Sequence, residues 1–193
     1  MIGLKPYCCC GTSIAGIDAV SKITREHDIN TKEIKEIIVS ASPETYKLTA
    51  TIEPTDVTSA QLSGRFSIAL RLIKGGNGFN EYTESNIRDS EILDLTERIK
   101  YTLDEDLAKT RECENPTKVT IRLIDGTVHE ETVYAGKGSI LNPMTHEEVC
   151  QKFREFASMI LPEKNNVEAI IKTVEELDSV NNIRELSQLL VTS

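Results

Sequence analysis

The chain has 193 residues, of which 39% are hydrophobic and 27% charged, which is enough for one well-buried core or two small ones and argues against disorder. Its 31 acidic and 22 basic residues give a net charge of -9, which would repel a nucleic acid. No apolar run approaches the roughly 18 residues of a membrane span, and residues 1–5 lack the apolar stretch of a signal peptide, so we expect a cytoplasmic protein that binds neither nucleic acid nor membrane.

The N-terminal third predicts a helix followed by two strands. Thr12 or Ser13 is placed to cap a helix that ends near residues 27–28 and whose apolar stripe is Ile14, Ile17, Val20 and Ile23. Apolar and polar residues then alternate over residues 37–41, and again over residues 48–52 after Pro43, as they do in half-buried strands.

Residues 58–103 predict further helices and a third strand. Thr58-Ser59-Ala60-Gln61 has the spacing of a capping box, and apolar residues with helical period continue through Phe66 until Gly75-Gly76 ends the helix. Gly75-Gly76-Asn77-Gly78 follows a helix rather than a strand, so it indicates a turn and not a phosphate-binding loop. Residues 83–97 predict one or two short helices, and residues 99–103 alternate as in a strand.

The remainder of the chain predicts a hairpin and then helices. Residues 119–123 and 127–134 alternate on either side of Asp125-Gly126, a dipeptide typical of tight hairpin turns, so these strands should pair antiparallel. Thr145-His146-Glu147-Glu148 is a second capping box, and helical stripes follow over residues 149–160, 167–177 and 183–190.

Together these elements predict an α+β fold with two parts. Residues 1–142 should form a small mixed or antiparallel sheet with helices packed on it, and residues 143–193 a tail of three helices. Three short helices bury little surface among themselves, so we expect the tail to pack on the α+β part or on a helical partner.

Few side chains suggest chemistry. The three histidines, at positions 27, 129 and 146, fall at a helix end, in the hairpin and in a cap, and we interpret each as a surface residue. Five cysteines are an odd number, and three of them are adjacent, which favours reduced thiols over a disulfide framework. Cys113 and Cys150 belong to no CxxC pair and have no accompanying histidine at the spacing of a metal ligand, so we expect no metal site and no cofactor.

The most unusual segment is Lys5-Pro6-Tyr7-Cys8-Cys9-Cys10-Gly11-Thr12, which places a lysine and three thiols just before a helix start. Lys5, Thr12, Ser13 and the free backbone N–H groups would hold a carboxylate-bearing substrate, and a nearby thiol would have a lowered pKa. The alternative is an extended segment whose cysteines simply pack, and periodicity alone favours this alternative.

Several segments carry a family resemblance when they are taken in order. They are Lys5-Pro6-Tyr7-Cys8-Cys9-Cys10-Gly11, Ile17-Asp18-Ala19, residues 34–39, 60–63 and 68–70, Gly136-Lys137-Gly138, Asn142-Pro143-Met144-Thr145 and Lys152-Phe153-Arg154. Their order and spacing resemble the second half of MmgE/PrpD proteins. The resemblance covers nearly the whole chain and corresponds to the C-terminal half of the family.

The resemblance implies both a fold and a class of activity. The family includes 2-methylcitrate dehydratase, cis-aconitate decarboxylase and iminodisuccinate epimerase, which act on small polycarboxylates without a required metal. Its members combine a large helical domain with an α+β lid and are commonly dimers, so residues 1–142 would be the lid and the tail would return to the helical domain. Most of the family's acid-base and substrate-binding residues lie on that N-terminal helical domain, which the resemblance does not cover.

Within the matched half, Lys5 corresponds to the family's lid lysine. Ile14 stands at the position of a family histidine and Phe66 at that of a tyrosine, so two catalytic positions are replaced by residues without a titratable proton. Loss of such a group costs on the order of 10²–10⁴-fold in rate. Ser13 is the nearest polar candidate to Ile14, and no catalytic residue is assigned.

Three hypotheses for function remain. The first is the lid half of a lyase or isomerase, inactive alone, that works with a helical N-terminal-half polypeptide or as a homodimer. The second is a non-catalytic remnant that binds a partner or a small di- or tricarboxylate. The third, which is independent of the resemblance, is a small α+β binding module.

Overall fold

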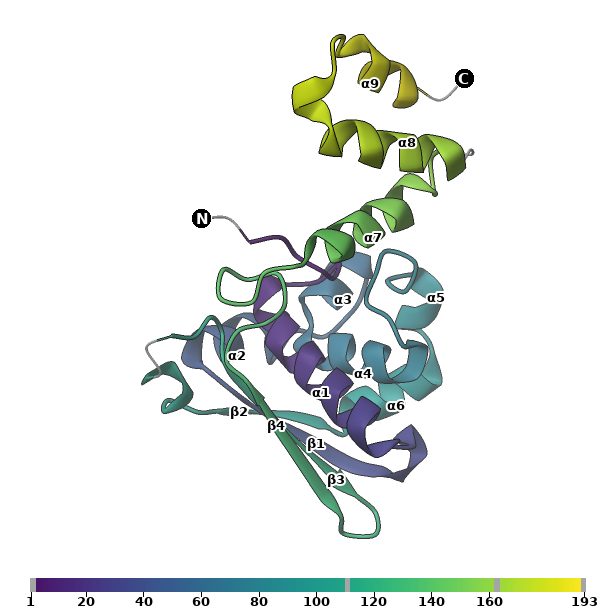
Figure 1. The fold of residues 1–193 in the computed structure, drawn as a ribbon. Coiled ribbons are helices and arrows are strands. Elements are labelled where there is room, and N and C mark those ends of the chain that lie inside the picture. The colour runs from purple at the N-terminus through teal and green to yellow at the C-terminus, as the bar shows by residue number, and fades with distance from the viewer. Residues whose placement is uncertain (1–2, 110–111, 162–163, 192–193) are drawn as a thin grey trace. The chain divides into compact units, whose positions relative to one another are not determined.

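The computed structural model describes residues 3–109, 112–161 and 164–191, and it divides into two compact units, Met1–Pro143 and Met144–Ser193 (Figure 1). The fold is α+β, with one mixed four-stranded sheet and helices at the C-terminal end of the chain, as the sequence predicts. Within these described ranges, every helix is too short or too polar to cross a bilayer.

The sheet lies entirely in the first unit and has the strand order β2-β1-β3-β4. Its central strand, β1 (Ile34–Ala41), pairs parallel with β2 (Ile99–Leu103) and antiparallel with β3 (Thr117–Leu123). β4 (Val128–Val133) then pairs antiparallel with β3 across the turn at Asp125-Gly126. The predicted hairpin and the predicted strand at 99–103 are therefore confirmed.

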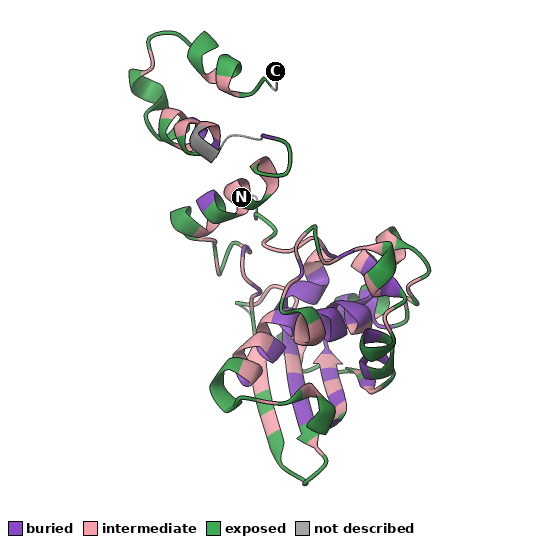
Figure 2. Ribbon diagram, turned by 90° about the vertical axis from the view of Figure 1, so that its right-hand side faces the viewer, coloured by how far each residue is buried: buried purple, intermediate pink, exposed green. Residues whose placement is uncertain are grey.

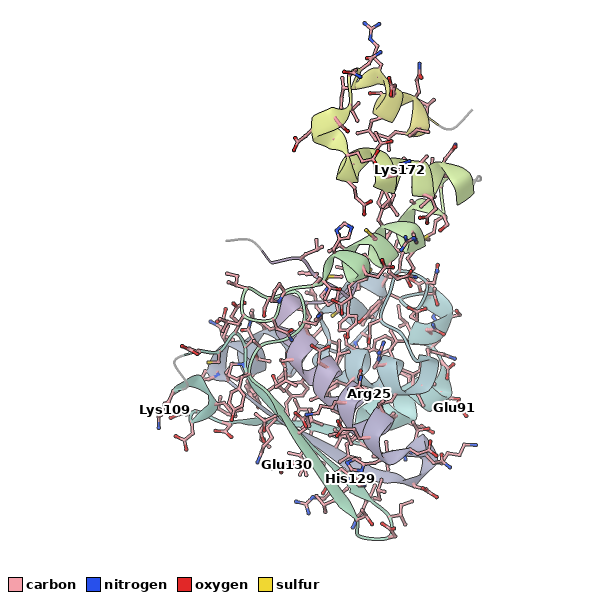
Figure 3. All side chains as sticks on the ribbon, in the orientation of Figure 1. Arg25, Glu91, Lys109, His129, Glu130 and Lys172 are labelled. Carbon is pink, nitrogen blue, oxygen red and sulfur yellow. The ribbon has the colours of Figure 1, made fainter. Side chains whose placement is uncertain are left out.

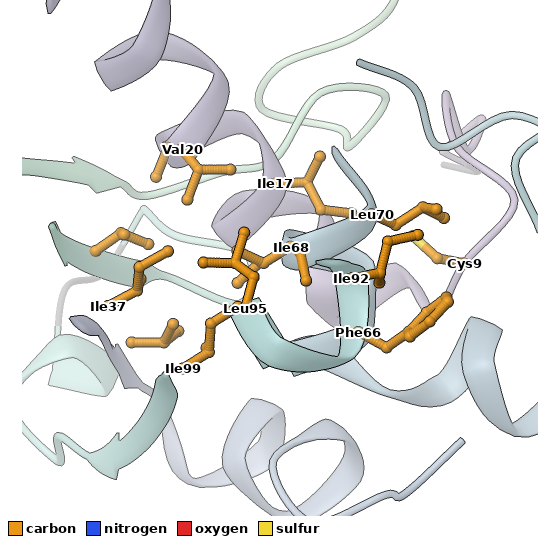
Figure 4. Packing of buried hydrophobic residues seen from close by; sticks show 14 of the residues in the cluster. Cys9, Ile17, Val20, Ile37, Phe66, Ile68, Leu70, Ile92, Leu95 and Ile99 are labelled. Atoms are coloured by element: carbon orange, nitrogen blue, oxygen red, sulfur yellow. The ribbon is translucent and has the colours of Figure 1, made fainter. Parts of the chain in front are cut away.

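Helices cover one face of this sheet. The helices of this unit are α1 (Ile14–His27), α2 (Pro43–Thr49), α3 (Val57–Leu62), α4 (Gly64–Lys74), α5 (Glu84–Ile87) and α6 (Ser90–Glu97), with single 3₁₀ turns at Gly11–Ser13, Thr31–Glu33 and Leu107–Lys109. α2 and α6 contact strands of the sheet, and α3 and α5 pack on other helices. α1 contacts β3 and β4, and α4 contacts α1, α6 and β2. The largest buried side chains, shown in Figure 4, lie between these helices and the sheet, and they include Ile17, Val20, Ile37, Phe66, Ile68, Leu70, Ile92 and Ile99.

The opposite face of the sheet is polar. Because side chains alternate across a strand, Glu36 on β1 shares this face with Lys100 and Arg122, and it forms ion pairs with both at 3.1 and 3.3 Å. Glu130, labelled in Figure 3, pairs with Lys118 at 3.4 Å on the same face. Figure 2 shows the matching contrast, with buried residues concentrated where the helices meet the sheet.

One predicted strand is wrong. Residues 48–52 do not form a strand, because the chain from Pro43 to Thr49 is helix α2. Proline fits the first turn of a helix, where its missing N–H has no partner to lose. The inward face of α2 carries the buried Thr45 and Thr49, so hydrophobic periodicity does not reveal the helix, while Leu48 stays 44% exposed.

The predicted long helix from residue 58 to residue 74 is in fact two helices. Ser63 has extended backbone angles, ends α3, and caps α4 by accepting a hydrogen bond from the Phe66 N–H. The capping box also lies two residues earlier than predicted, with Asp56 and Ser59 as its members. The helix end at Gly75 and the two short helices α5 and α6 are confirmed.

The second unit contains three α-helices among its described residues: α7 (His146–Ala157), α8 (Lys164–Glu175) and α9 (Arg184–Leu189), with a 3₁₀ turn at Leu177–Ser179. The predicted capping box of Thr145 and Glu148 starts α7. The buried core of this unit is small and consists of Leu161, Val167 and Ile170. Arg154 on α7 adds ion pairs to Glu147 and to Glu168 of α8 at 2.8 and 2.7 Å.

The hairpin turn makes a stability prediction. Gly126 has a φ of 92° and open space around it, so a Gly126→Ala substitution should cost about 1–2 kcal/mol of unfolding free energy through backbone conformation alone. Gly11→Ala is the matched control, because its φ is not positive and its Cβ would meet only Lys5 Cε at 3.7 Å. Urea unfolding measures the unfolding free energy of both variants, and equal values for Gly126→Ala and Gly11→Ala would contradict the prediction.

Candidate functional site

The segment before α1 is held in place by three neighbouring loops. Its backbone N–H groups at Leu4, Cys8 and Cys10 donate to the carbonyl oxygens of Gly138, Asn77 and Gln61, each at 2.8 Å. These acceptors lie far apart in sequence, so the segment depends on the tertiary fold for its conformation.

Asp18 of α1 ties this segment to the loop after β4. Its Oδ1 accepts a hydrogen bond from the Tyr7 hydroxyl at 2.8 Å, and its Oδ2 accepts one from the Lys137 backbone N–H at 2.7 Å. Burial raises the pKa of the Asp18 carboxyl, although these hydrogen bonds oppose the shift. The Arg71 guanidinium lies 5.7 Å from the centre of the Tyr7 ring. One half-buried carboxylate therefore joins three segments of the chain.

The loop after β4 can approach closely because two of its residues are glycines. Gly138 has a φ of 82°, and a Cβ there would overlap the Leu4 carbonyl oxygen. A Cβ on Gly136 would lie 2.8 Å from Ile14 Cγ2. The Gly-Lys-Gly sequence thus brings the loop against both the N-terminal segment and the start of α1.

Lys5 lies at the edge of two hollows that these contacts create. The first, of about 170 Å³, is bounded by Lys5, Lys137 and Glu114 as its charged residues and by Ile14, Ala15 and several glycines. The second, of about 410 Å³, is lined by Lys5, the cysteine run and residues of α3. The Lys5 ammonium donates to the Cys9 carbonyl oxygen at 3.3 Å and remains exposed to solvent. A cation shared by two hollows is suited to binding an anion.

The other two expected ligands are placed differently. Thr12 is buried, and its hydroxyl contacts the Cys10 Sγ at 3.2 Å. Ser13 is also buried, and its Oγ has no hydrogen-bond partner within the described parts of the chain. Ser13 occupies the cap position of α1 without making a capping hydrogen bond. Lys5 lines both hollows, whereas Thr12 and Ser13 line neither.

Ile14 and Phe66, the two positions at which the resemblance implies a lost catalytic residue, have separate environments. Ile14 forms an apolar wall of the first hollow, close to Lys5. Phe66 is fully buried in the core, with its ring centre 6.3 Å from that of Tyr82, and lines neither hollow. Ile14 thus faces the place where a ligand would sit, and Phe66 contributes to packing.

The expectation of an activated thiol does not hold for Cys9. Burial raises the pKa of the Cys9 thiol to about 12, so it stays protonated and unreactive at neutral pH. The five cysteines, which all lie within the described residues, form no disulfide. At Cys9 the structure instead agrees with the alternative interpretation, in which the cysteines pack.

Asp18 was missed as a functional residue by the sequence analysis. A signal was present, since Asp18 lies four residues after Ile14 and three before Ser21, and so places a charge beside the apolar stripe of α1.

The expectation that no histidine is spaced suitably for Cys150 is also wrong. His146 lies four residues before it on α7, and the two side chains meet with Glu175 in the second unit.

Comparisons with known proteins agree on one family. A model of the MmgE/PrpD C-terminal domain matches residues 7–177. A cis-aconitate decarboxylase of Aspergillus terreus (strain NIH 2624 / FGSC A1156) is 25% identical over 98% of this chain, and another from Aspergillus terreus is 24% identical over the same share. The chain spans 40% of the length of each relative.

Removing the Asp18 carboxylate should loosen the site. Asp18→Ala leaves the Tyr7 hydroxyl and the Lys137 N–H without an acceptor and should lower the unfolding free energy by about 2–4 kcal/mol. Asp18→Asn keeps one acceptor oxygen, so its unfolding free energy should fall by less. Tyr7→Phe should lower the unfolding free energy by only about 1 kcal/mol. Chemical denaturation measures all three, and hydrogen exchange should quicken at residues 136–138 in Asp18→Ala. A loss below about 0.5 kcal/mol in that variant would refute the role of Asp18.

The buried Cys9 thiol should make stability fall in alkali. From about pH 9 upward the unfolded chain loses this proton while the folded chain keeps it until about pH 12, so the unfolding free energy should fall by up to about 1.4 kcal/mol per pH unit across that window. Cys9→Ala removes this contribution and should give a shallower pH dependence. Urea unfolding of wild type and Cys9→Ala between pH 8 and pH 11, with a reductant present, measures this difference. If the unfolding free energies of the two proteins fall in parallel with pH, the Cys9 thiol is not the cause.

Proposed function

Because this chain belongs to the MmgE/PrpD family, as its C-terminal domain, we propose that these residues form the lid half of a lyase or isomerase that acts on small polycarboxylates. The matched relatives are named for the decarboxylation of cis-aconitate, a tricarboxylate, and they extend over more than twice the matched length. Catalysis by this half then requires residues from a helical N-terminal half, on the same or another polypeptide, or from a second copy of the chain. The cytoplasm is the proposed location.

The observation that carries the proposal is the position of Lys5. It is exposed at the edge of two hollows, and Lys137 lines one of them, in a chain whose net charge is -9. The two lysines outnumber Glu114, the one acidic residue that lines the same hollow, so this hollow favours an anion such as a carboxylate. The Asp18 contacts join the segment that carries Lys5 to the loop that carries Lys137, so the backbone of both lysines is held in place before a ligand binds.

A second candidate is a non-catalytic remnant that still binds a carboxylate or a partner. Ile14 favours it, because an apolar side chain lines the first hollow at the position where the resemblance has a histidine. An isoleucine there transfers no proton and lowers the polarity of the hollow. Binding without turnover in the presence of a helical half would favour this candidate.

Activity is the first test. The 193-residue protein alone should not turn over cis-aconitate, citrate or methylcitrate, because Ile14 lines the first hollow where the resemblance has a catalytic histidine, and the family's other acid-base residues lie outside the matched half. Assays of CO₂ release and of dehydration should match the enzyme-free control. Turnover above that control would show that this half is sufficient for catalysis and overturn the proposal that it needs another half.

Binding is the second test. Titration of citrate and cis-aconitate, followed by amide chemical shifts, should perturb residues around Lys5 and Gly136–Gly138. One charge-assisted contact contributes roughly 1.5–3 kcal/mol, so Lys5→Ala should weaken binding about 10- to 100-fold from an affinity near millimolar. Lys109→Ala is the matched control, because Lys109 is exposed and pairs only with Asp106 on its own turn among the ion pairs of the described residues. Equal affinity in Lys5→Ala and wild type would remove Lys5 from the site.

A further inference from the structure

The second unit brings together three side chains that commonly bind metal ions. His146 and Cys150 lie one turn apart on α7, so both project from the same side of that helix, and Glu175 is the last residue of α8. Their ligand atoms all lie within 4.8 Å of one another, and across the described residues this is the one group of its kind. The proposed polycarboxylate site does not use any of them.

One of the three ligand-atom distances already suits a tetrahedral ion, and the others are close enough for side-chain rotation to reach it. The His146 Nε2 lies 3.4 Å from the Cys150 Sγ and 2.5 Å from the Glu175 Oε1. Zinc bonds of about 2.0–2.3 Å place tetrahedral ligand atoms roughly 3.3–3.7 Å apart. The histidine–sulfur distance already fits this geometry. The histidine–carboxylate distance must open by less than about 1 Å, and both side chains are largely exposed, at 70% and 45%, so rotamer adjustment is enough.

The surrounding contacts fix the two helices that carry the ligands. The capping box of Thr145 and Glu148 sets the first turn of α7, where His146 begins the helix. Arg154 binds Glu168 through two hydrogen bonds, at 2.7 and 3.1 Å, which joins α7 to α8. The small core of Leu161, Val167 and Ile170 packs in the same unit. The ligand atoms are therefore brought together by contacts that do not depend on a metal.

We propose that His146, Cys150 and Glu175 bind one Zn²⁺ ion, with water in the fourth position. An imidazole nitrogen, a thiolate and a carboxylate form a donor set suited to zinc, whereas calcium and magnesium prefer oxygen ligands alone. The same three residues border a largely apolar hollow of about 310 Å³, which leaves room for the water ligand beside Val149 and Val174. Zinc bound here joins the start of α7 to the end of α8 and stabilises the unit.

Cobalt is the probe for this site, because tetrahedral Co²⁺ absorbs in the visible and a thiolate ligand adds a charge-transfer band in the near ultraviolet. Co²⁺ titrated into the full chain under reducing, anaerobic conditions should saturate at one equivalent with both bands, and added Zn²⁺ should remove them. Zn²⁺ should also raise the thermal midpoint of unfolding. Saturation without a thiolate band, or no binding at micromolar metal, would overturn the proposal.

Variants locate the ion. Cys150→Ser should abolish the charge-transfer band, and His146→Gln and Glu175→Gln should each weaken Zn²⁺ binding by about 100-fold or more, since even an outer-shell partner is worth 10- to 100-fold. Cys113→Ser and His129→Gln are the matched controls in the first unit and should bind as wild type does. His146 and Glu175 are exposed, so their variants test the site even if Cys150→Ser unfolds the tail.

The three adjacent cysteines are the competing source of a thiolate signal. If the band persists in Cys150→Ser but vanishes when Cys8 and Cys10 are replaced by serine, the ion lies at the N-terminal segment and the proposal is wrong. If the band depends on Cys150 alone, and Zn²⁺ affinity falls in all three ligand variants, the site is assigned. Neither outcome depends on carboxylate binding at Lys5, so it is independent of the proposed function.

Discussion

The Asp18 carboxylate provides the side-chain contact that joins the segments around the candidate site, in addition to the backbone hydrogen bonds of Leu4, Cys8 and Cys10. Asp18 uses one oxygen to hold the Tyr7 hydroxyl and the other to hold the Lys137 N–H, and so joins the N-terminal segment, α1 and the loop after β4. An extended segment lacks the regular backbone hydrogen bonds of a helix or sheet, so contacts with neighbouring segments hold its side chains in place. Lys5 lies between two such anchors, the Leu4 N–H bonded to Gly138 and the Tyr7 hydroxyl bonded to Asp18.

The two units use different physical means to hold their sites. The first has an extensive core between its helices and one face of its sheet, and the half-buried Asp18 carboxylate at the edge of this core is satisfied by two hydrogen bonds. The second buries few side chains and relies on Arg154 and a capping box at the surface. Exposed ion pairs stabilise weakly, which is why a metal ion would matter more to this unit than to the first.

Hydrophobic periodicity did not predict the structure correctly where inward-facing residues are polar, or where residues that lie close in space are distant in sequence. α2 buries threonines, so its helix was invisible to hydrophobic periodicity and read as a strand. The break at Ser63 separates α3 from α4 without interrupting the apolar spacing. Thr12 and Ser13 were expected at the ligand, but the 3₁₀ turn before α1 turns both of them inward.

The α+β class, the hairpin at Asp125-Gly126, the helix from Ile14 to His27 and the start of α7 could be predicted from the sequence, because local propensity, capping and turn chemistry specify them. The family could be predicted from the order and spacing of its motifs. The meeting of distant side chains could be seen only in the folded chain. Asp18 with Tyr7 and Lys137, Lys5 between two hollows, and Glu175 beside His146 and Cys150 each join segments that are separated along the chain. Such contacts arise from packing of whole elements, and residue spacing within one segment cannot identify the partner that a distant segment supplies.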